Sequence, residues 1–172
     1  KAIRSLELFG LPGIKNLNLY LNQIEKKHPK KIHKIDKDNK GKELCPIYCG
    51  VAFLDQCQQL ENLNHVKFYN VNYPILILPF ISKASEILGR KIFVKFNTSS
   101  LLMNFNKSIL SKNLEKQVIN LVDEASIEFL GNKNSFSNQE WKELYKLSEK
   151  TFVEETDSLK AKGAGAGLTD ND

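Results

Sequence analysis

The sequence predicts an α+β fold in which N-terminal helices are followed by a small mixed sheet with helices packed on it. Three observations indicate this class. Apolar residues recur at helical spacing in the first third of the chain, β-branched and aromatic residues then gather in short runs, and no sustained strand-helix-strand rhythm follows. A length of 172 residues suits a single domain, which we place at residues 1–159, with a glycine-rich acidic tail at 160–172.

Helices are expected first. The first helix ends near Phe9, because glycine and proline follow at residues 10–13. The second runs to about Lys27, with an apolar stripe formed by Ile14, Leu17, Leu21 and Ile24. The third begins at Pro46, since the first helical turn tolerates proline, and its almost continuous apolar surface as far as Asp55 predicts a central position.

Strands are expected next. The segment from His65 to Leu78 predicts one or two strands, and Pro74 argues against an unbroken central strand there. A helix ended by Gly89 follows. The alternating string "KIFVKFNT" predicts a strand, and "SLLMNF" after it is expected to pair with that strand.

The last third of the chain is expected to divide near Asp123. Leu114 to Val122 suits a helix, whereas "ASIEFLG" alternates like a strand. Ser137 is placed to cap a final helix, whose stripe comprises Trp141, Leu144, Tyr145, Ser148 and Phe152.

The net charge of +5 is concentrated locally. Residues 1–42 contain eleven Lys and Arg against four Asp and Glu, whereas the other 130 residues contain fourteen against sixteen. The run from Lys26 to Lys42 has eight lysines but neither an arginine nor an aromatic residue, the groups that read bases or stack on them. This composition favours a solvated loop over a phosphate-binding patch, so nucleic acid is not the expected partner.

The three cysteines raise two chemical hypotheses. Helical spacing separates Cys57 from Cys49 by about 12 Å, too far to share a zinc ion, so we expect buried thiols and no metal site. Cys45 is placed at a helix N-terminus, which lowers a thiol pKa and suits a nucleophile, but no histidine, His65 included, is placed beside it as a base. Three cysteines make no disulfide framework, which indicates a reducing compartment, the cytoplasm.

Two further expectations concern membranes and the N-terminus. The longest apolar run, Tyr73–Ile81, is about half of the roughly 18 residues that a membrane span requires, so no membrane association is expected. The chain opens at Lys1 within an amphipathic pattern, and we expect a further N-terminal segment in the native protein.

The chain ends in "KGAGAGLTDND". This string is not a nucleotide-binding loop, because no helix follows its glycines. The glycines permit a close approach of the backbone to another surface, and the side-chain oxygens beyond them suit a cation or basic groups. The alternative is an unstructured terminus. The candidate ligand-binding residues are therefore Gly163, Gly165, Gly167, Thr169, Asp170 and Asp172.

Several strings together resemble a family of small bacterial proteins classed as a domain of unknown function. They are "LFGLPG", "LCPIYCG", "YPILILPF" with "LGRKI" behind it, and above all "ETDSLKAKGAGAGLTDND". The resemblance extends from Leu8 to Asp172. It implies a shared fold, an important C-terminal tail and an additional N-terminal helical stretch, and it supplies neither a reaction nor a cofactor.

Three functions follow as alternatives. The first is an uncharacterised small-molecule-binding protein or enzyme whose tail completes the site. The second is a non-catalytic accessory subunit that docks on a metabolic enzyme through the tail. The third is nucleic-acid binding through Lys26–Lys42.

Overall fold

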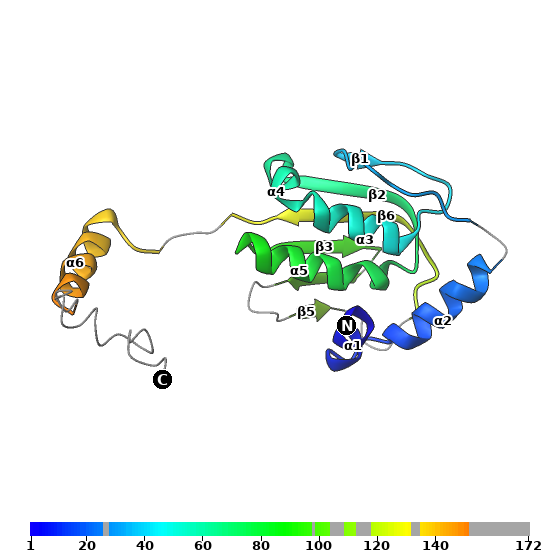
Figure 1. Ribbon diagram of the computed structural model, residues 1–172, viewed down its shortest axis with the longest axis horizontal. Helices are drawn as coiled ribbons and strands as arrows, with labels where there is room; N and C mark the ends of the chain where they lie inside the picture. Colours follow the sequence, from blue (N-terminus) through cyan, green and yellow to red (C-terminus); the bar gives the residue numbers. More distant parts are fainter. Residues whose placement is uncertain (26–27, 98, 104–108, 113–117, 132–134, 152–172) are drawn as a thin grey trace, which may run out of the picture. The chain divides into compact units, whose positions relative to one another are not determined.

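The computed structural model describes the chain except for residues 26–27, 98, 104–108, 113–117, 132–134 and 152–172 (Figure 1). The chain divides into two units, residues 1–132 and 133–172, which are considered separately. The six candidate tail residues, Gly163 to Asp172, and the predicted boundary at 159/160 lie outside the described residues.

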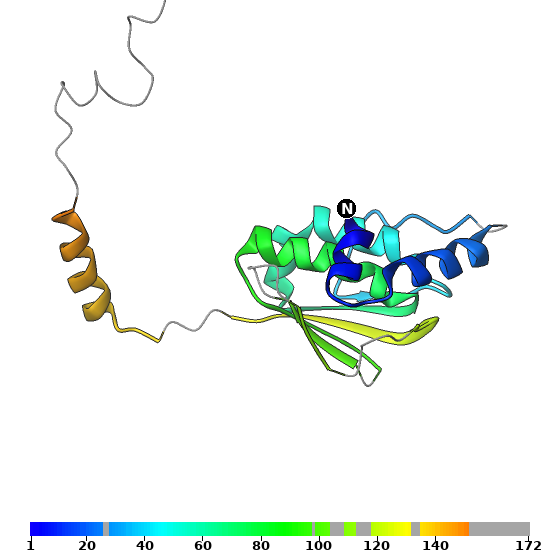
Figure 2. The same cartoon turned by 90° about the horizontal axis from the view of Figure 1, so that it is seen from below.

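The first unit places its main helices on one side of its sheet (Figures 1 and 2). Helix α3 packs against α5 and η2, while α1 packs against α2 and α5. The helical elements are α1 (Ala2–Leu8), α2 (Gly13–Ile24), α3 (Pro46–Asp55), α4 (Cys57–Leu60), η1 (Glu61–Leu63), η2 (Pro74–Ile77) and α5 (Leu78–Leu88).

The described strands form one mixed sheet in the order β1-β2-β6-β3-β4-β5. Strand β1 is parallel to β2, and every other neighbouring pair is antiparallel. Because β2 and β3 both run antiparallel to β6, η2 and α5 form a crossover between two parallel strands. The α+β prediction is confirmed. The strands are β1 (Asp38–Asn39), β2 (His65–Asn72), β3 (Ile92–Phe96), β4 (Ser99–Met103), β5 (Ile109–Lys112) and β6 (Leu121–Phe129).

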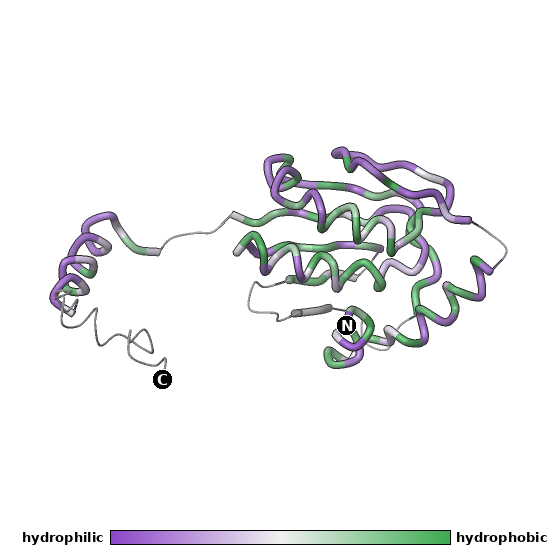
Figure 3. Tube along the Cα trace, in the orientation of Figure 1, coloured by the Kyte–Doolittle hydropathy of each residue, from purple (hydrophilic) through white to green (hydrophobic). Residues whose placement is uncertain are grey.

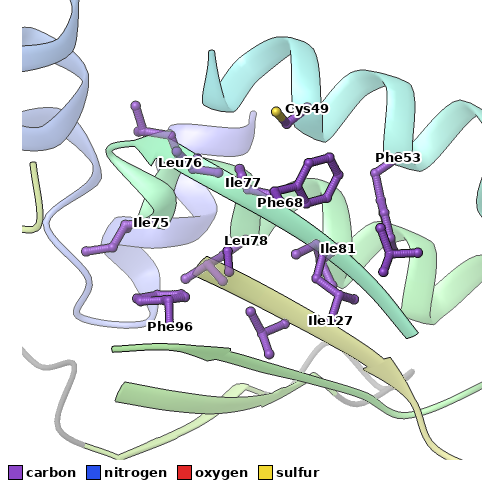
Figure 4. Packing of buried hydrophobic residues seen from close by; sticks show 14 of the residues in the cluster. Cys49, Phe53, Phe68, Ile75, Leu76, Ile77, Leu78, Ile81, Phe96 and Ile127 are labelled. Atoms are coloured by element: carbon purple, nitrogen blue, oxygen red, sulfur yellow. The ribbon is translucent and has the colours of Figure 1, made fainter. Parts of the chain in front are cut away.

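Strand periodicity separates a buried face of the sheet from an exposed one. Val66, Ile127 and Val94 are register partners on three adjacent strands and are buried, and a polar residue follows each of them. Cys49 and Phe53 project from α3 toward this face, where the Phe53 ring stacks on Phe129 at a centroid distance of 5.8 Å (Figure 4). The core therefore lies between the sheet and α3 with α5.

Most of the predicted elements are confirmed. Helix α1 ends at Leu8, α3 begins at Pro46, and α5 ends before Gly89, which adopts a φ of 59° as the C-cap. The "KIFVKFNT" strand pairs with "SLLM" as β3 and β4. Five of the ten residues of α3 are buried, and the helix contacts both α5 and η2, so its predicted central position is also confirmed.

The predicted stripe of α2 is wrong at two positions. Ile14 and Leu21 are 57% and 47% exposed. The residues that α2 buries are Gly13, Asn16 and Tyr20, while the stripe residues Leu17 and Ile24 are partly buried against the core. The buried face of α2 therefore centres on Tyr20, whose ring packs against Tyr73.

Two other predictions need correction. Residues 74–77 form the 3₁₀ helix η2 rather than a strand, because Tyr73 takes left-handed backbone angles and Pro74 cannot continue a ladder. The helix predicted from Leu114 to Val122 is wrong at its end, where Leu121 begins β6. Residues 114–117 lie outside the described part of the chain.

The second unit contains α6 (Asn138–Glu149). Ser137 caps it as predicted: the Ser137 hydroxyl accepts a hydrogen bond from the Glu140 amide at 3.2 Å, and the Glu140 carboxylate accepts one from the Ser137 amide at 2.6 Å. These bonds lower the pKa of Glu140. Trp141 stacks on Phe136 at 5.5 Å. The stripe residue Phe152 lies outside the described residues.

The close approach of α3 and α5 depends on Gly50. A methyl group there would overlap the Phe80 ring. We expect Gly50→Ala to lower the free energy of unfolding by roughly 1–3 kcal/mol, measured by urea denaturation. Gly131→Ala is the matched control, because no atom lies within 4 Å of the added methyl. Equal stability of the two variants would contradict this packing.

Candidate functional site: a lysine-lined pocket

Residues 28–44, here called the strap, run along the outer edge of β2 and join α2 to α3. Three backbone bonds fix the strap there: Lys67 N donates to Lys37 O at 2.8 Å, Leu44 N to Asn70 O at 2.8 Å, and Asn72 N to Leu44 O at 3.1 Å. The strap therefore satisfies backbone hydrogen-bonding groups along the outer edge of β2.

Side chains add further anchors to the strap. The Asn39 amide donates to Lys67 O at 3.0 Å, and the Asn70 amide donates to Gly41 O at 2.9 Å. Near the opposite end, Gln56 accepts from the Ile35 amide at 3.1 Å and donates to His33 O at 3.2 Å. The lysine-rich run is hydrophilic and mostly exposed at its side chains, as expected (Figure 3), and its backbone is hydrogen-bonded from His33 onward.

Between the strap and α2 lies a pocket of about 730 Å³, here called the strap pocket. It is larger than the groove beside α1 and α5, at about 570 Å³, and the hollow beside His65, at about 470 Å³. Its volume falls within the range of about 300–1,000 Å³ found for small-molecule sites. Its lining residues are Tyr20, Ile24, His28, Pro29, Lys30, Lys31, Ile32, Lys40, Gly41, Lys42, Glu43, Leu44 and Asn72.

The rim of the strap pocket is basic. Lys30, Lys31 and Lys42 are exposed there, and none of them forms an ion pair with another described residue. Lys40 differs, because its ammonium lies over the Tyr69 ring at 5.7 Å from the centroid. Like charges repel one another, so an anion bound between these lysines would lower that repulsion.

Tyr20 forms part of the pocket wall and is only 1% exposed. Its hydroxyl is buried and has no hydrogen-bond partner in the described structure, which is uncommon for a buried polar group. Burial raises the pKa of Tyr20, and the neighbouring Cys45 thiol raises it further. The Tyr20 hydroxyl therefore lies beside the Cys45 thiol, which affects its pKa without meeting the geometric criterion for a hydrogen bond.

The backbone beside Tyr20 is strained. Tyr73 has φ 43° and ψ 59°, a conformation that residues other than glycine and asparagine seldom adopt. Its ring packs edge-on against Tyr20 at a centroid distance of 5.9 Å. Asn72, which is 4% exposed, immediately precedes it and lines the pocket. Strain of this kind concentrates at functional sites, which favours the strap pocket as one.

The cysteines are buried, free thiols, as predicted. Cys45 is the N-cap of α3, and its sulfur accepts from the Tyr48 amide at 3.5 Å. Burial raises the pKa of Cys49, and the adjacent Cys45 adds to this effect, so the Cys49 thiol stays protonated. His65 is not beside Cys45, because Leu44 pairs with Val71, about 20 Å along β2 from His65. His65 therefore cannot serve as the base of a Cys45 nucleophile.

The structure does not test the predicted tail site, since all six of its residues lie outside the described ranges. Within those ranges, no group of three or more His, Cys, Asp or Glu side chains is arranged to hold a metal ion. The lysine run was interpreted as a solvated loop rather than a binding patch, and Tyr20, Leu44 and Asn72 carried no sequence signal for a site, because the fold alone brings them together.

Comparison of the chain with protein-family models, curated proteins and solved structures finds no match. None of the helices in the described ranges is long and apolar enough to cross a lipid bilayer. The function is therefore argued from the geometry of the described residues.

Two buried groups predict a loss of stability in alkali. The ordinary pKa is 9.0 for Cys49 and 10.0 for Tyr20, and burial raises both in the folded state. Below about pH 8 both groups are mostly protonated in either state. At higher pH the unfolded chain releases protons that the folded chain retains, so the free energy of unfolding falls.

We expect Tyr20→Phe to make this decline shallower above pH 10. At pH 7 it should leave stability unchanged or slightly higher, because it removes a buried hydroxyl that has no partner. Urea denaturation at pH 7 to 11 measures both effects. Tyr145→Phe, at an exposed side chain, is the control. A large loss of stability in Tyr20→Phe at pH 7 would show that the hydroxyl has a structural partner.

Proposed function

We propose that this protein binds a small anionic molecule in the strap pocket. The observation that carries the proposal is the basic rim, where Lys30, Lys31 and Lys42 lie without ion-pair partners among the described residues around a pocket of about 730 Å³. Lysine ammonium groups are mobile point charges that suit phosphate, sulfate or carboxylate groups. The proposal gives the small-molecule function a specific site and a sign of charge.

The geometry favours a small anion over nucleic acid. The three lysines surround one concave pocket, whereas a nucleic-acid backbone needs positive charge along an extended path. Glu43 also lines the pocket, and its carboxylate lowers the net positive charge of the lining. Binding through the whole run from Lys26 to Lys42 remains the alternative that the salt dependence of RNA binding would test.

Replacing the rim lysines should weaken anion binding. We expect Lys30→Gln, Lys31→Gln and Lys42→Gln each to weaken inorganic pyrophosphate by about fivefold in isothermal titration calorimetry, and the triple variant to abolish binding. Lys37→Gln is the control, because this exposed strap lysine does not line the pocket. Equal weakening by Lys37→Gln would indicate a diffuse electrostatic effect instead of a site.

We propose separately that the C-terminal tail contributes to ligand or partner binding. The composition of residues 163–172 supports this role, and so does their resemblance to the bacterial family. We propose on the same ground that the protein is a member of that family. The three free thiols support a cytoplasmic location. The accessory-subunit alternative differs in requiring a stoichiometric protein partner, which co-purification from the native source would reveal.

Deleting residues 163–172 should abolish ligand or partner binding with little change in thermal stability. A thermal-shift screen with a metabolite panel compares the full chain with the deletion variant and with Asp170→Asn/Asp172→Asn. Glu154→Gln/Glu155→Gln, which removes two other charges near the C-terminus, is the control. If the tail variants keep every ligand and partner of the full chain, the tail proposal is wrong.

A further inference from the structure

We infer that the ligand of the strap pocket is an amphipathic anion, with its charged group at the lysine rim and an apolar body between α2 and the strap. This inference rests on the proposed function of the same pocket. It is carried by the separation of charged and apolar side chains within the lining.

The apolar part of the lining comes from both sides of the strap pocket. Ile24 belongs to α2, whereas Ile32 and Leu44 belong to the two ends of the strap. All three are half-buried, so each leaves apolar surface on the pocket for a ligand to cover. Covering apolar surface with an apolar ligand is favourable, whereas a hydrated inorganic anion leaves that surface in water.

The charged part comes from both ends of the strap as well. Lys30 and Lys31 precede Ile32, and Lys42 lies two residues before Leu44. Each apolar wall residue of the strap is therefore adjacent to rim lysines in the sequence. A ligand that contacts both kinds of side chain has one charged end and one apolar part.

The volume supports a ligand with a body. A pocket of about 730 Å³ is many times the roughly 30 Å³ that one water molecule occupies, so a single phosphate or carboxylate group fills only a small part of it. Gly41 lets the Leu44 side chain pack directly on the strap backbone, because a methyl group at residue 41 would overlap that side chain. The Gly41 carbonyl also accepts a hydrogen bond from the Asn70 side chain, which helps to hold this wall in place.

The test titrates the full chain with three probes in isothermal titration calorimetry: inorganic phosphate, hexyl phosphate and hexyltrimethylammonium. We expect hexyl phosphate to bind at least about tenfold more tightly than inorganic phosphate, since about six methylene-sized groups leave water. The cationic probe should not bind. Chemical-shift changes of amides at Leu44 and Asn72 would locate the bound hexyl phosphate in the strap pocket.

Two variants separate the parts of the ligand. Lys42→Gln should weaken both phosphate probes by a similar factor, whereas Ile32→Ala should weaken hexyl phosphate by about fivefold and leave inorganic phosphate unchanged. Ile24→Ala repeats the wall test on α2, in case Ile32→Ala disturbs the strap. Leu21→Ala is the control, because this exposed residue of α2 does not line the pocket.

The outcomes distinguish the inference from the proposed function. Equal affinities for the two phosphates, with no effect of either wall variant, would overturn the amphipathic ligand and leave anion binding in place. Binding of hexyltrimethylammonium as tight as hexyl phosphate would overturn the role of charge. If neither phosphate binds, both the proposed function and the inference fail.

Discussion

The hydrogen bonds between the strap and β2 are the constraint on which the candidate site depends. They cover the edge of the sheet, where exposed backbone groups would otherwise pair with another chain. They also fix the point at which Cys45 caps α3, so the same contacts that close the edge position the central helix. Lys42 lies within the part of the strap that these bonds anchor, whereas Lys30 and Lys31 precede the first anchored residue, His33.

The end of β2 shows how the chain turns from sheet to pocket. Asn70 has φ 56°, a conformation that asparagine tolerates better than most residues, and its side chain holds Gly41. The alternation of buried and less buried residues along β2 ends at Asn70, and the next two residues, Val71 and Asn72, are both buried. Tyr73 then enters η2 in a left-handed conformation, against Tyr20. Two strained residues thus direct the chain past the pocket wall and into the crossover that leads to α5.

Sequence patterns predicted this fold where one local rule decides the outcome. The cap at Ser137, the helix end at Gly89 and the alternation in β3 each depend on neighbouring residues only. The buried face of α2 was not predictable in this way. Ile14 and Leu21 are exposed and Tyr20 is buried instead, because the Tyr20 ring packs on a residue 53 positions away. The pocket was unpredictable for the same reason. The lysine run is visible in the sequence, whereas its pairing with β2 is a long-range contact.

The choice of lysine at the rim bears on the kind of ligand. An arginine fork fixes the geometry of a phosphate through paired hydrogen bonds, whereas an ammonium attracts an anion without fixing its orientation. A site with lysines alone therefore gains little discrimination from its charged group. Discrimination must come from groups with fixed positions, which here are the apolar walls. The uncharged part of the ligand is consequently what this pocket is built to recognise.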